Sequence, residues 1–400
     1  MRALSADLFC RVIDNLGDIG VMWRLARQLH DEKGWQIRLW VDDLKSLGAI
    51  EPMIDRDKLQ QVCRHVDVRQ WPAQWGTHLT TACPLIEPNP IVIAGFSCDL
   101  PPDYLKALAQ QPTALWLQLE YLSAQDWVES FHGLSSLRND GLKPVFFFPG
   151  FTLKTGGLLR ETELLAQRDQ WIAQQEGPHW LSAIGVTPSD NPTLVSVFTY
   201  PTAPIHSFIE QLQQTGKRYH LLIPSTQPLP ADRLPKQPKD ATVTWQTIKF
   251  LSQSDYDRLL WSCELNLVRG EDSLVRAIWA GKPLLWQIYP QTDGAHHDKL
   301  KAWLALANPP ATATLAMHEW ADGQLHTDLS PVLAGDGWQQ WRQSSRDLCD
   351  RLAEQSDLAT RLDTLARHQL NSGGGLESRV CYLIAPQQNL PAHRRRSIYP

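Results

Sequence analysis

Residues 268–290 read VRGEDSLVRAIWAGKPLLWQIYP, and this stretch decides the fold. An apolar run over 265–268 ends at Arg269 and Gly270. A helical pattern follows, with its apolar residues on one face, and it stops at Gly281. A second apolar run starts at Leu284. Strand, polar turn, short helix, turn and strand in this order predict one βαβ unit of a parallel sheet.

The polar turn of this unit also predicts a binding site. A helix N-terminus presents backbone N–H groups without helical partners, and these groups and the helix dipole attract phosphate. Arg269 can add charge-assisted hydrogen bonds to the same phosphate. Glu271 and Asp272 follow directly, and a carboxylate beside a phosphate site is unfavourable unless it binds a ribose hydroxyl or a metal. The turn, which ends at Ser273, therefore indicates a nucleotide-diphosphate donor.

Length and charge limit the class of protein. A chain of 400 residues normally forms two domains. Its 43% hydrophobic and 20% charged residues are ordinary for a globular protein. The net charge of −5 argues against a direct nucleic-acid binder, which is usually basic.

The cysteines and the apolar runs predict a compartment. The chain has 7 cysteines with no CxxC spacing, which favours reduced thiols in a cytoplasm. Charges at Asp7 and Arg11 interrupt any signal-like run near the N-terminus. No apolar stretch has the length of a transmembrane helix, so we expect no membrane span.

Apolar runs alternate with helical patterns along most of the chain, which is typical of an α/β fold with parallel sheets. A cluster of Gly and Pro between 175 and 192 interrupts the alternation, which then restarts. We expect one Rossmann-like domain over 1–183, a second over 184–336, and C-terminal helices with a tail over 337–400. Ligands are expected in the cleft between the two sheets. The predicted strands are 8–13, 36–41, 91–94, 114–119, 145–148, 194–198, 219–223, 242–247, 265–268 and 284–288.

A second motif, DNLGDIG at 14–20, follows the first predicted strand. Asp14 and Asp18 lie four residues apart on a glycine-bearing loop, where they could face the cleft. The alternative for Asp18 is a cap on the helix that follows. A dinucleotide site is not expected, because GxGxxG is absent.

No metal site is expected from the sequence. The two DxD strings, at 55–57 and 255–257, do not directly follow apolar strands, and we interpret them as solvated surface or helix starts. His296 and His297 are adjacent, so their side chains should point in different directions, and no third ligand is apparent.

Several longer motifs resemble the bacterial protein-arginine rhamnosyltransferases that modify elongation factor P. They are the segments 9–20 and 23–29, LEYLS at 119–123, FFFPGFT at 146–152, TGGLLRE at 155–161, RGEDS at 269–273 and WAGKP to WQIYPQ at 279–291. The resemblance implies a GT-B-like fold, with two Rossmann-like domains facing a central cleft. It also implies an inverting enzyme that needs no metal and no cofactor.

The implied reaction moves L-rhamnose from dTDP-β-L-rhamnose to an arginine of translation elongation factor P. This modification would activate the factor for the relief of ribosome stalling at polyproline. Elongation factor P and the nucleotide-sugar donor are the implied partners.

The resemblance also carries roles for individual residues. Asp18 matches the general base, while Asp14 and Glu271 match two further functional carboxylates. The residues that it places at the substrate are Arg269, Asp272 and Ser273 in the nucleotide-binding turn, the aromatic residues Phe198, Tyr200, Phe250 and Tyr256, and Tyr289 with Gln291. For Phe198 and Phe250 the alternative is ordinary core packing, and for Asp272 it is a helix cap.

Carboxylates suit the implied acceptor. A guanidinium group stays protonated up to a pH above about 12 and is a poor nucleophile, so it must be held and must lose a proton. Two alternatives remain open: a GT-B enzyme with another nucleotide sugar and acceptor, and a non-catalytic protein that senses a nucleotide sugar or binds a translation factor.

Overall fold

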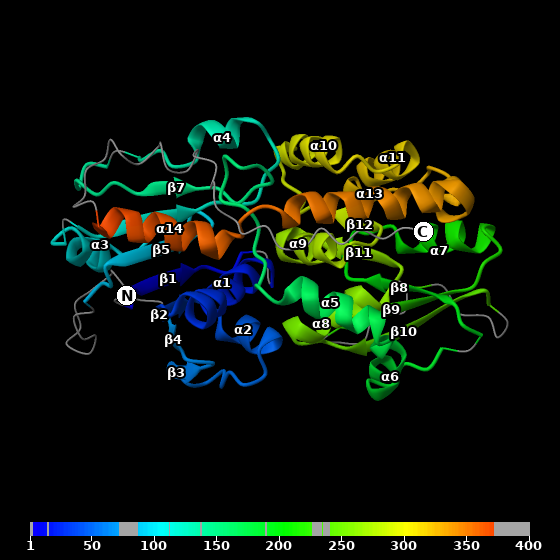
Figure 1. Cartoon of the computed structure of the whole chain (residues 1–400), viewed down its shortest axis with the longest axis horizontal. Helices are drawn as coiled ribbons and strands as arrows, with labels where there is room; N and C mark the ends of the chain where they lie inside the picture. The colour runs from blue at the N-terminus through cyan, green and yellow to red at the C-terminus, as the bar shows by residue number, and fades with distance from the viewer. Residues whose placement is uncertain are drawn as a thin grey trace, which may run out of the picture.

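The structure is a computed structural model, and it describes residues 3–13, 16–71, 87–111, 113–136, 138–188, 190–225, 234 and 241–371. Asp14 and Asn15 are outside these ranges, as is the basic C-terminal tail. The two lobes lie side by side, each built around one sheet (Figure 1). No helix among the described residues is long and apolar enough to cross a membrane.

The N-terminal lobe contains a seven-stranded sheet, parallel except for the pair β3–β4 at one edge. In spatial order its strands are β3 (Gln60–Cys63), β4 (Val66–Gln70), β2 (Gln36–Val41), β1 (Ser5–Cys10), β5 (Ile91–Gly95), β6 (Leu115–Leu119) and β7 (Val145–Phe147). Its helices are α1 (Gly17–Lys33), α2 (Leu44–Ile50), α3 (Pro102–Leu108) and α4 (Trp127–Phe131). Strand β1 ends three residues earlier than predicted, and the pair β3–β4 was not predicted. Strand β3, at the sheet edge, alternates exposed and buried residues, and β4 beside it is only partly buried, so neither has the continuous apolar run of a central strand.

The C-terminal lobe contains a five-stranded parallel sheet. In spatial order its strands are β10 (Val243–Lys249), β9 (Tyr219–Ser225), β8 (Thr193–Val197), β11 (Leu265–Arg269) and β12 (Leu284–Gln287). Its helices are α7 (Ile205–Gln214), α8 (Gln253–Ser262), α9 (Gly270–Ala280), α10 (Ala295–Ala307), α11 (Ala311–Ala321) and α12 (Ser330–Leu333). The helices α5 (Leu164–Ala173) and α6 (Glu176–Ala183) lie in the connection between the two sheets and pack near α8. The βαβ unit predicted from the opening stretch is thus confirmed as β11–α9–β12.

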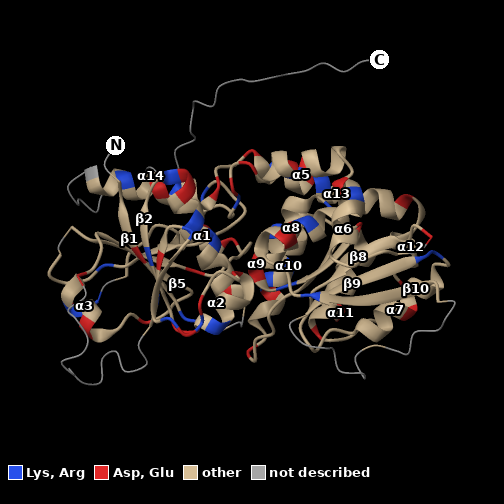
Figure 2. Cartoon of the chain, turned by 90° about the horizontal axis from the view of Figure 1, so that it is seen from below, with Lys and Arg blue, Asp and Glu red and all other residues tan. Residues whose placement is uncertain are grey.

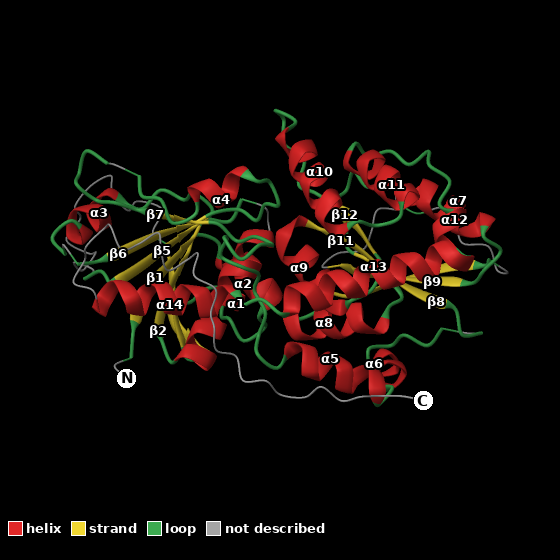
Figure 3. Cartoon of the chain, turned by 45° about the horizontal axis from the view of Figure 1, so that its top comes forward, coloured by secondary structure: helices red, strands yellow, loops and turns green. Residues whose placement is uncertain are grey.

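The last two helices pack on different lobes. Helix α13 (Gly335–Ala353) packs against α9, whereas α14 (Leu358–Asn371) packs against α1 (Figure 3). Trp35 donates a hydrogen bond of 2.7 Å to Asp363 of α14, and Lys33 donates one of 2.8 Å to Thr360. The predicted C-terminal helices are thus present, and the chain crosses between the lobes at 354–357, where no break was predicted. The domain boundaries at 183/184 and 336/337 stay a prediction.

Candidate functional site

The strand order places a ligand crevice on each lobe. Strand β1 lies between β2 and β5, and strand β8 lies between β9 and β11, so the chain leaves each of these strands at a point where the sheet order reverses. Ligands of open α/β sheets bind at the carboxyl ends of such strands. The loop from β1 into α1 and the loops after β8 and β11 therefore carry the candidate site.

Two cavities lie at the strand ends of the C-terminal lobe, and together we call them the donor side. One, of about 50 Å³, lies between the lobes, and Phe198, Phe250 and Arg269 line it together with Gly17 and Gly20 of α1. Tyr256, Asp272 and Ser273 line the same cavity. The other, of about 190 Å³, extends over β8 and β9 and is again lined by Phe198, Phe250 and Arg269. The six predicted residues are thus brought together on the donor side.

The aromatic residues surround Arg269. Its guanidinium carbon lies 4.4 Å from the ring centre of Phe198 and 4.8 Å from that of Tyr200. The Phe198 ring in turn meets Phe250 at 6.0 Å and Tyr256 at 5.6 Å between ring centres. Tyr200 is buried, and its backbone N–H donates a 2.7 Å hydrogen bond to Gln287. The rings therefore hold the Arg269 cation in place while Phe198 and Phe250 keep partly exposed faces.

The N-terminus of helix α9 is not capped by the side chain of its N-cap residue, which suits the binding of a phosphate there. Its N-cap residue is Arg269, which makes no side-chain cap hydrogen bond, and the next residue is Gly270 with φ of 62°. Ser273 lies in the first turn of α9, where it is buried and lines the smaller donor-side cavity. The interpretation of Asp272 as a helix cap is wrong, because it lies inside the first turn.

Asp272 belongs to a buried ionic network that joins the lobes. The Arg24 side chain of α1 is 3% exposed and pairs with Asp272 at 3.1 Å, Asp257 at 3.3 Å and Glu161 at 3.4 Å. Arg276 of α9 pairs with Asp257 and Glu161, each at 2.7 Å. Figure 2 shows charged residues where α1, α8 and α9 meet. The interpretation of the second DxD string as solvated surface or a helix start is therefore wrong in part, because Asp257 is buried in this network.

The network affects the acids within it. Burial acts to raise the pKa of Glu161, but Arg276 and Arg24 lower it well below its usual range. Burial raises the pKa of Asp272, and the same two arginines oppose that change. The lobes approach closely here, since a Cβ added at Gly20 would lie 3.2 Å from a carboxylate oxygen of Asp272. Asp272 thus braces α1 against α9 at the edge of the donor side.

A third cavity, of about 210 Å³, lies on the other side of the same helix ends, and we call it the acceptor side. Asp18 and Glu271 line it, together with Tyr289 and Gln291. Tyr289 and Gln291 are exposed, and the Tyr289 ring meets Tyr200 at 5.7 Å. Of the residues that the resemblance places at the substrate, these two thus line the acceptor side rather than the donor-side cavities.

The two described carboxylates are held by backbone groups. Asp18 is 3% exposed and accepts a 2.8 Å hydrogen bond from the Ile13 N–H. The N-cap of α1 is Leu16, so the alternative role of Asp18 as the cap residue is wrong. Glu271 accepts a 2.8 Å hydrogen bond from the Leu122 N–H across the cleft. Asp14, the third predicted carboxylate, lies outside the described residues.

Sequence reasoning missed several residues that the structure places here. Arg24 joins the lobes, while Phe96, Tyr121 and Lys299 line the acceptor side. A signal existed for Arg24 and Tyr121, which lie in the segments 23–29 and 119–123 that carry the family resemblance, but not for Phe96 or Lys299.

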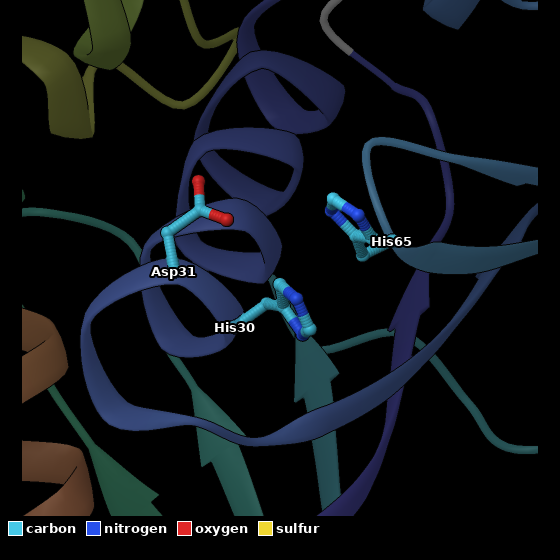
Figure 4. Close-up of side chains that lie close together, drawn as sticks. All are labelled: His30, Asp31 and His65. Atoms are coloured by element: carbon cyan, nitrogen blue, oxygen red, sulfur yellow. The ribbon is translucent and has the colours of Figure 1, made fainter.

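Within the described ranges, one group of three potential metal ligands lies close together: His30, Asp31 and His65 (Figure 4). The two imidazole rings are stacked with 17° between their planes, so their in-plane lone pairs do not converge on one ion. The group is also near the far end of α1 from the cleft. His296 and His297 were expected to point apart, but their ring centres lie 4.1 Å apart, and each has its own partner in Gln291 or Asp322.

Comparison with known proteins identifies the family. The model of the elongation-factor P rhamnosyltransferase EarP family matches residues 6–367. A protein-arginine rhamnosyltransferase of Pseudomonas putida is 43% identical over 382 residues, covering 91% of this chain and 99% of the relative. One from Pseudomonas aeruginosa is 39% identical over 381 residues, covering 90% and 97%.

Solved structures agree on the fold. A structure from work on EarP-mediated arginine glycosylation of translation elongation factor EF-P has a TM-score of 0.57 at 30% identity, covering 91% of this chain and 99% of that one. The glycosyltransferase VinC in complex with dTDP has a TM-score of 0.52 at 12% identity, covering 92% and 100%, and shows the fold alone. The architecture is GT-B, as predicted, and the chain belongs to the elongation-factor P rhamnosyltransferase EarP family.

Proposed function

We propose that this chain transfers L-rhamnose from dTDP-β-L-rhamnose to an arginine side chain of elongation factor P, with inversion and without a metal or cofactor. The modified factor would then relieve ribosome stalling at polyproline. One observation carries the proposal. The donor side and the acceptor side meet at the N-termini of α1 and α9, since Gly17 lines both, while Glu271 and Ser273 of one helical turn line opposite sides.

The donor side suits a nucleoside diphosphate sugar. The partly exposed faces of Phe198 and Phe250 offer stacking surfaces for a base, while Arg269, Ser273 and the N-terminus of α9 offer positive potential and donors for the diphosphate. The same groups would stabilise the charge that develops on dTDP as it leaves. Burial raises the pKa of the Tyr256 hydroxyl well above its usual value, so this ring stays uncharged beside the dianion.

The acceptor side suits a cation. Asp18 and Glu271 are fixed by backbone N–H groups and can hold a guanidinium in the plane of its N–H bonds. In the transfer, a guanidinium nitrogen forms a bond to the anomeric carbon as the bond from that carbon to the phosphate oxygen breaks. Asp18 accepts the proton that this nitrogen loses, and dTDP leaves with the electron pair. Attack on the face opposite the leaving group inverts the anomeric centre.

Intact-mass measurement tests the proposal. Elongation factor P incubated with the enzyme and dTDP-β-L-rhamnose should gain the mass of one rhamnosyl group. A factor with the acceptor arginine changed to lysine serves as the control and should gain nothing. A protein that binds UDP more tightly than dTDP and leaves the factor unmodified would instead support the alternative, another donor and acceptor on the same fold.

A further inference from the structure

The acceptor side has an unusual backbone at its rim. Directly after β5, Phe96 and Ser97 have φ of 55° and 54°, in the left-handed region that residues with a side chain seldom occupy. Two such residues in succession are unfavourable, and strain of this kind tends to persist where it positions a functional group.

The turn holds the end of β6. The Phe96 ring stacks on the Tyr121 ring, with 4.9 Å between their centres and 29° between their planes. The Ser97 hydroxyl donates a 2.9 Å hydrogen bond to the Glu120 carboxylate. The turn therefore holds the Tyr121 ring, which lines the acceptor side, and the carboxylate of the residue before it.

A cation already lies at this place. Lys299 reaches across from α10 on the other lobe, and its Nζ lies 5.4 Å from the centre of the Tyr121 ring. Burial raises the pKa of Glu120, and the Ser97 hydrogen bond and the charge of Lys299 oppose that change. Lys299 thus lies over the ring, and its charge acts on the carboxylate of the neighbouring residue without a direct ion pair between the two side chains.

We propose that Tyr121 and Glu120 form the subsite that receives the acceptor guanidinium, and that Lys299 occupies this position until the acceptor enters. The inference rests on the proposed function and deepens it. Asp18 and Glu271 would accept hydrogen bonds in the guanidinium plane, while the Tyr121 ring stacks on its flat face, which a guanidinium favours more than an ammonium does. Glu120 provides the counter-charge that Lys299 gives up when it moves.

Steady-state kinetics with elongation factor P tests whether the Tyr121 ring stacks on the acceptor guanidinium. Tyr121→Leu should raise the KM for the acceptor about three- to thirtyfold, the range of a cation–π contact, and Tyr121→Phe should restore it to within about twofold. The dTDP affinity should not change. Phe131→Leu, an exposed ring of α4, is the matched control. An unchanged KM in Tyr121→Leu, or an equal loss of dTDP affinity, would overturn the assignment.

Changes at the two charged residues test the rest of the proposal. Lys299→Met, which removes the competing cation from a partly exposed helix position, should lower the acceptor KM about two- to fivefold. Glu120→Gln should raise it about tenfold. An acceptor KM that rises or stays the same in Lys299→Met contradicts the role of this lysine, and an unchanged KM in Glu120→Gln contradicts the role of the carboxylate.

Binding of methylguanidinium, followed by NMR, separates this inference from the proposed function. The small cation should bind the wild type and Lys299→Met, more tightly in the latter, and should bind Tyr121→Leu most weakly. This pattern can hold even if elongation factor P proves not to be the acceptor. Equal binding to all three proteins would overturn the subsite while leaving the rhamnosyl transfer to be judged by intact mass.

Discussion

The donor side and the acceptor side share the N-termini of α1 and α9 but differ in the charge of the groups that line them. On the donor side, Arg269 lies among aromatic rings. On the acceptor side, Asp18 and Glu271 lie beside Tyr121. The first arrangement suits an anion with a flat base, and the second suits a flat cation. The difference therefore supports a different substrate for each side, and changes on one side should leave binding on the other side intact.

The largest effect is expected at Asp18. Asp18→Asn keeps the size of the side chain and can still accept from Ile13, but it removes the base, so kcat should fall about 10²–10⁴-fold. The dTDP affinity should stay within about twofold. Asp31→Asn, an exposed carboxylate on the same helix, is the control. Turnover within about tenfold of the wild type would remove Asp18 from the role of base.

The second-largest effect is expected in the buried ionic network around Arg24. Arg24→Met leaves Asp272 without its ion-pair partner and leaves Arg276 alone to balance Asp257 and Glu161, so the free energy of unfolding should fall by about 3–5 kcal/mol. Arg218→Met, which breaks an exposed pair with Asp190, should change it by less than about 1 kcal/mol. Denaturant unfolding measures both changes. Equal effects in the two variants would mean that the network does not brace the lobes.

A smaller effect is expected at Arg269. Arg269→Ala removes a charge-assisted contact to the diphosphate and should weaken dTDP binding about ten- to a hundredfold. Ser273→Ala should weaken it less, because a neutral hydroxyl is lost. Calorimetry gives both values, with Arg258→Ala, a change at an exposed residue of α8 that lines neither donor-side cavity, as the control. Unchanged dTDP affinity in Arg269→Ala would locate the diphosphate elsewhere.

No effect is expected from metal removal. Arg269 and the N-terminus of α9 supply the positive potential that a metal would otherwise provide, so excess EDTA should leave the rate unchanged. Added Mg²⁺ or Mn²⁺ should not raise it. Inactivation by EDTA with recovery in Mn²⁺ would make Asp18 and Glu271 candidates for metal ligands instead of acceptor groups.

Local sequence patterns predicted most of the fold. The central strands and the helix of the opening stretch follow from runs of apolar residues and from Gly281, whose φ of 64° ends α9. The edge pair β3–β4 and the break at 354–357 escaped prediction, because an edge strand and a crossing between lobes show no strong periodicity. The polar groups of the turn at 269–273 and of the loop before α1 were predictable from their place after apolar strands, the donor-side rings came only from the family resemblance, and Phe96 and Lys299 were not predicted.

By itself, the sequence determined the two parallel-sheet lobes, the helix that begins at Gly270 and that we propose as the diphosphate site, and the motifs that carry the family. Only the tertiary structure decided that Asp272 pairs with Arg24, 248 positions away, and that Lys299 lies over Tyr121. Residue patterns report local conformation because backbone periodicity is local. Contacts between lobes depend on how two separate sheets pack, so no spacing in the chain encodes them directly.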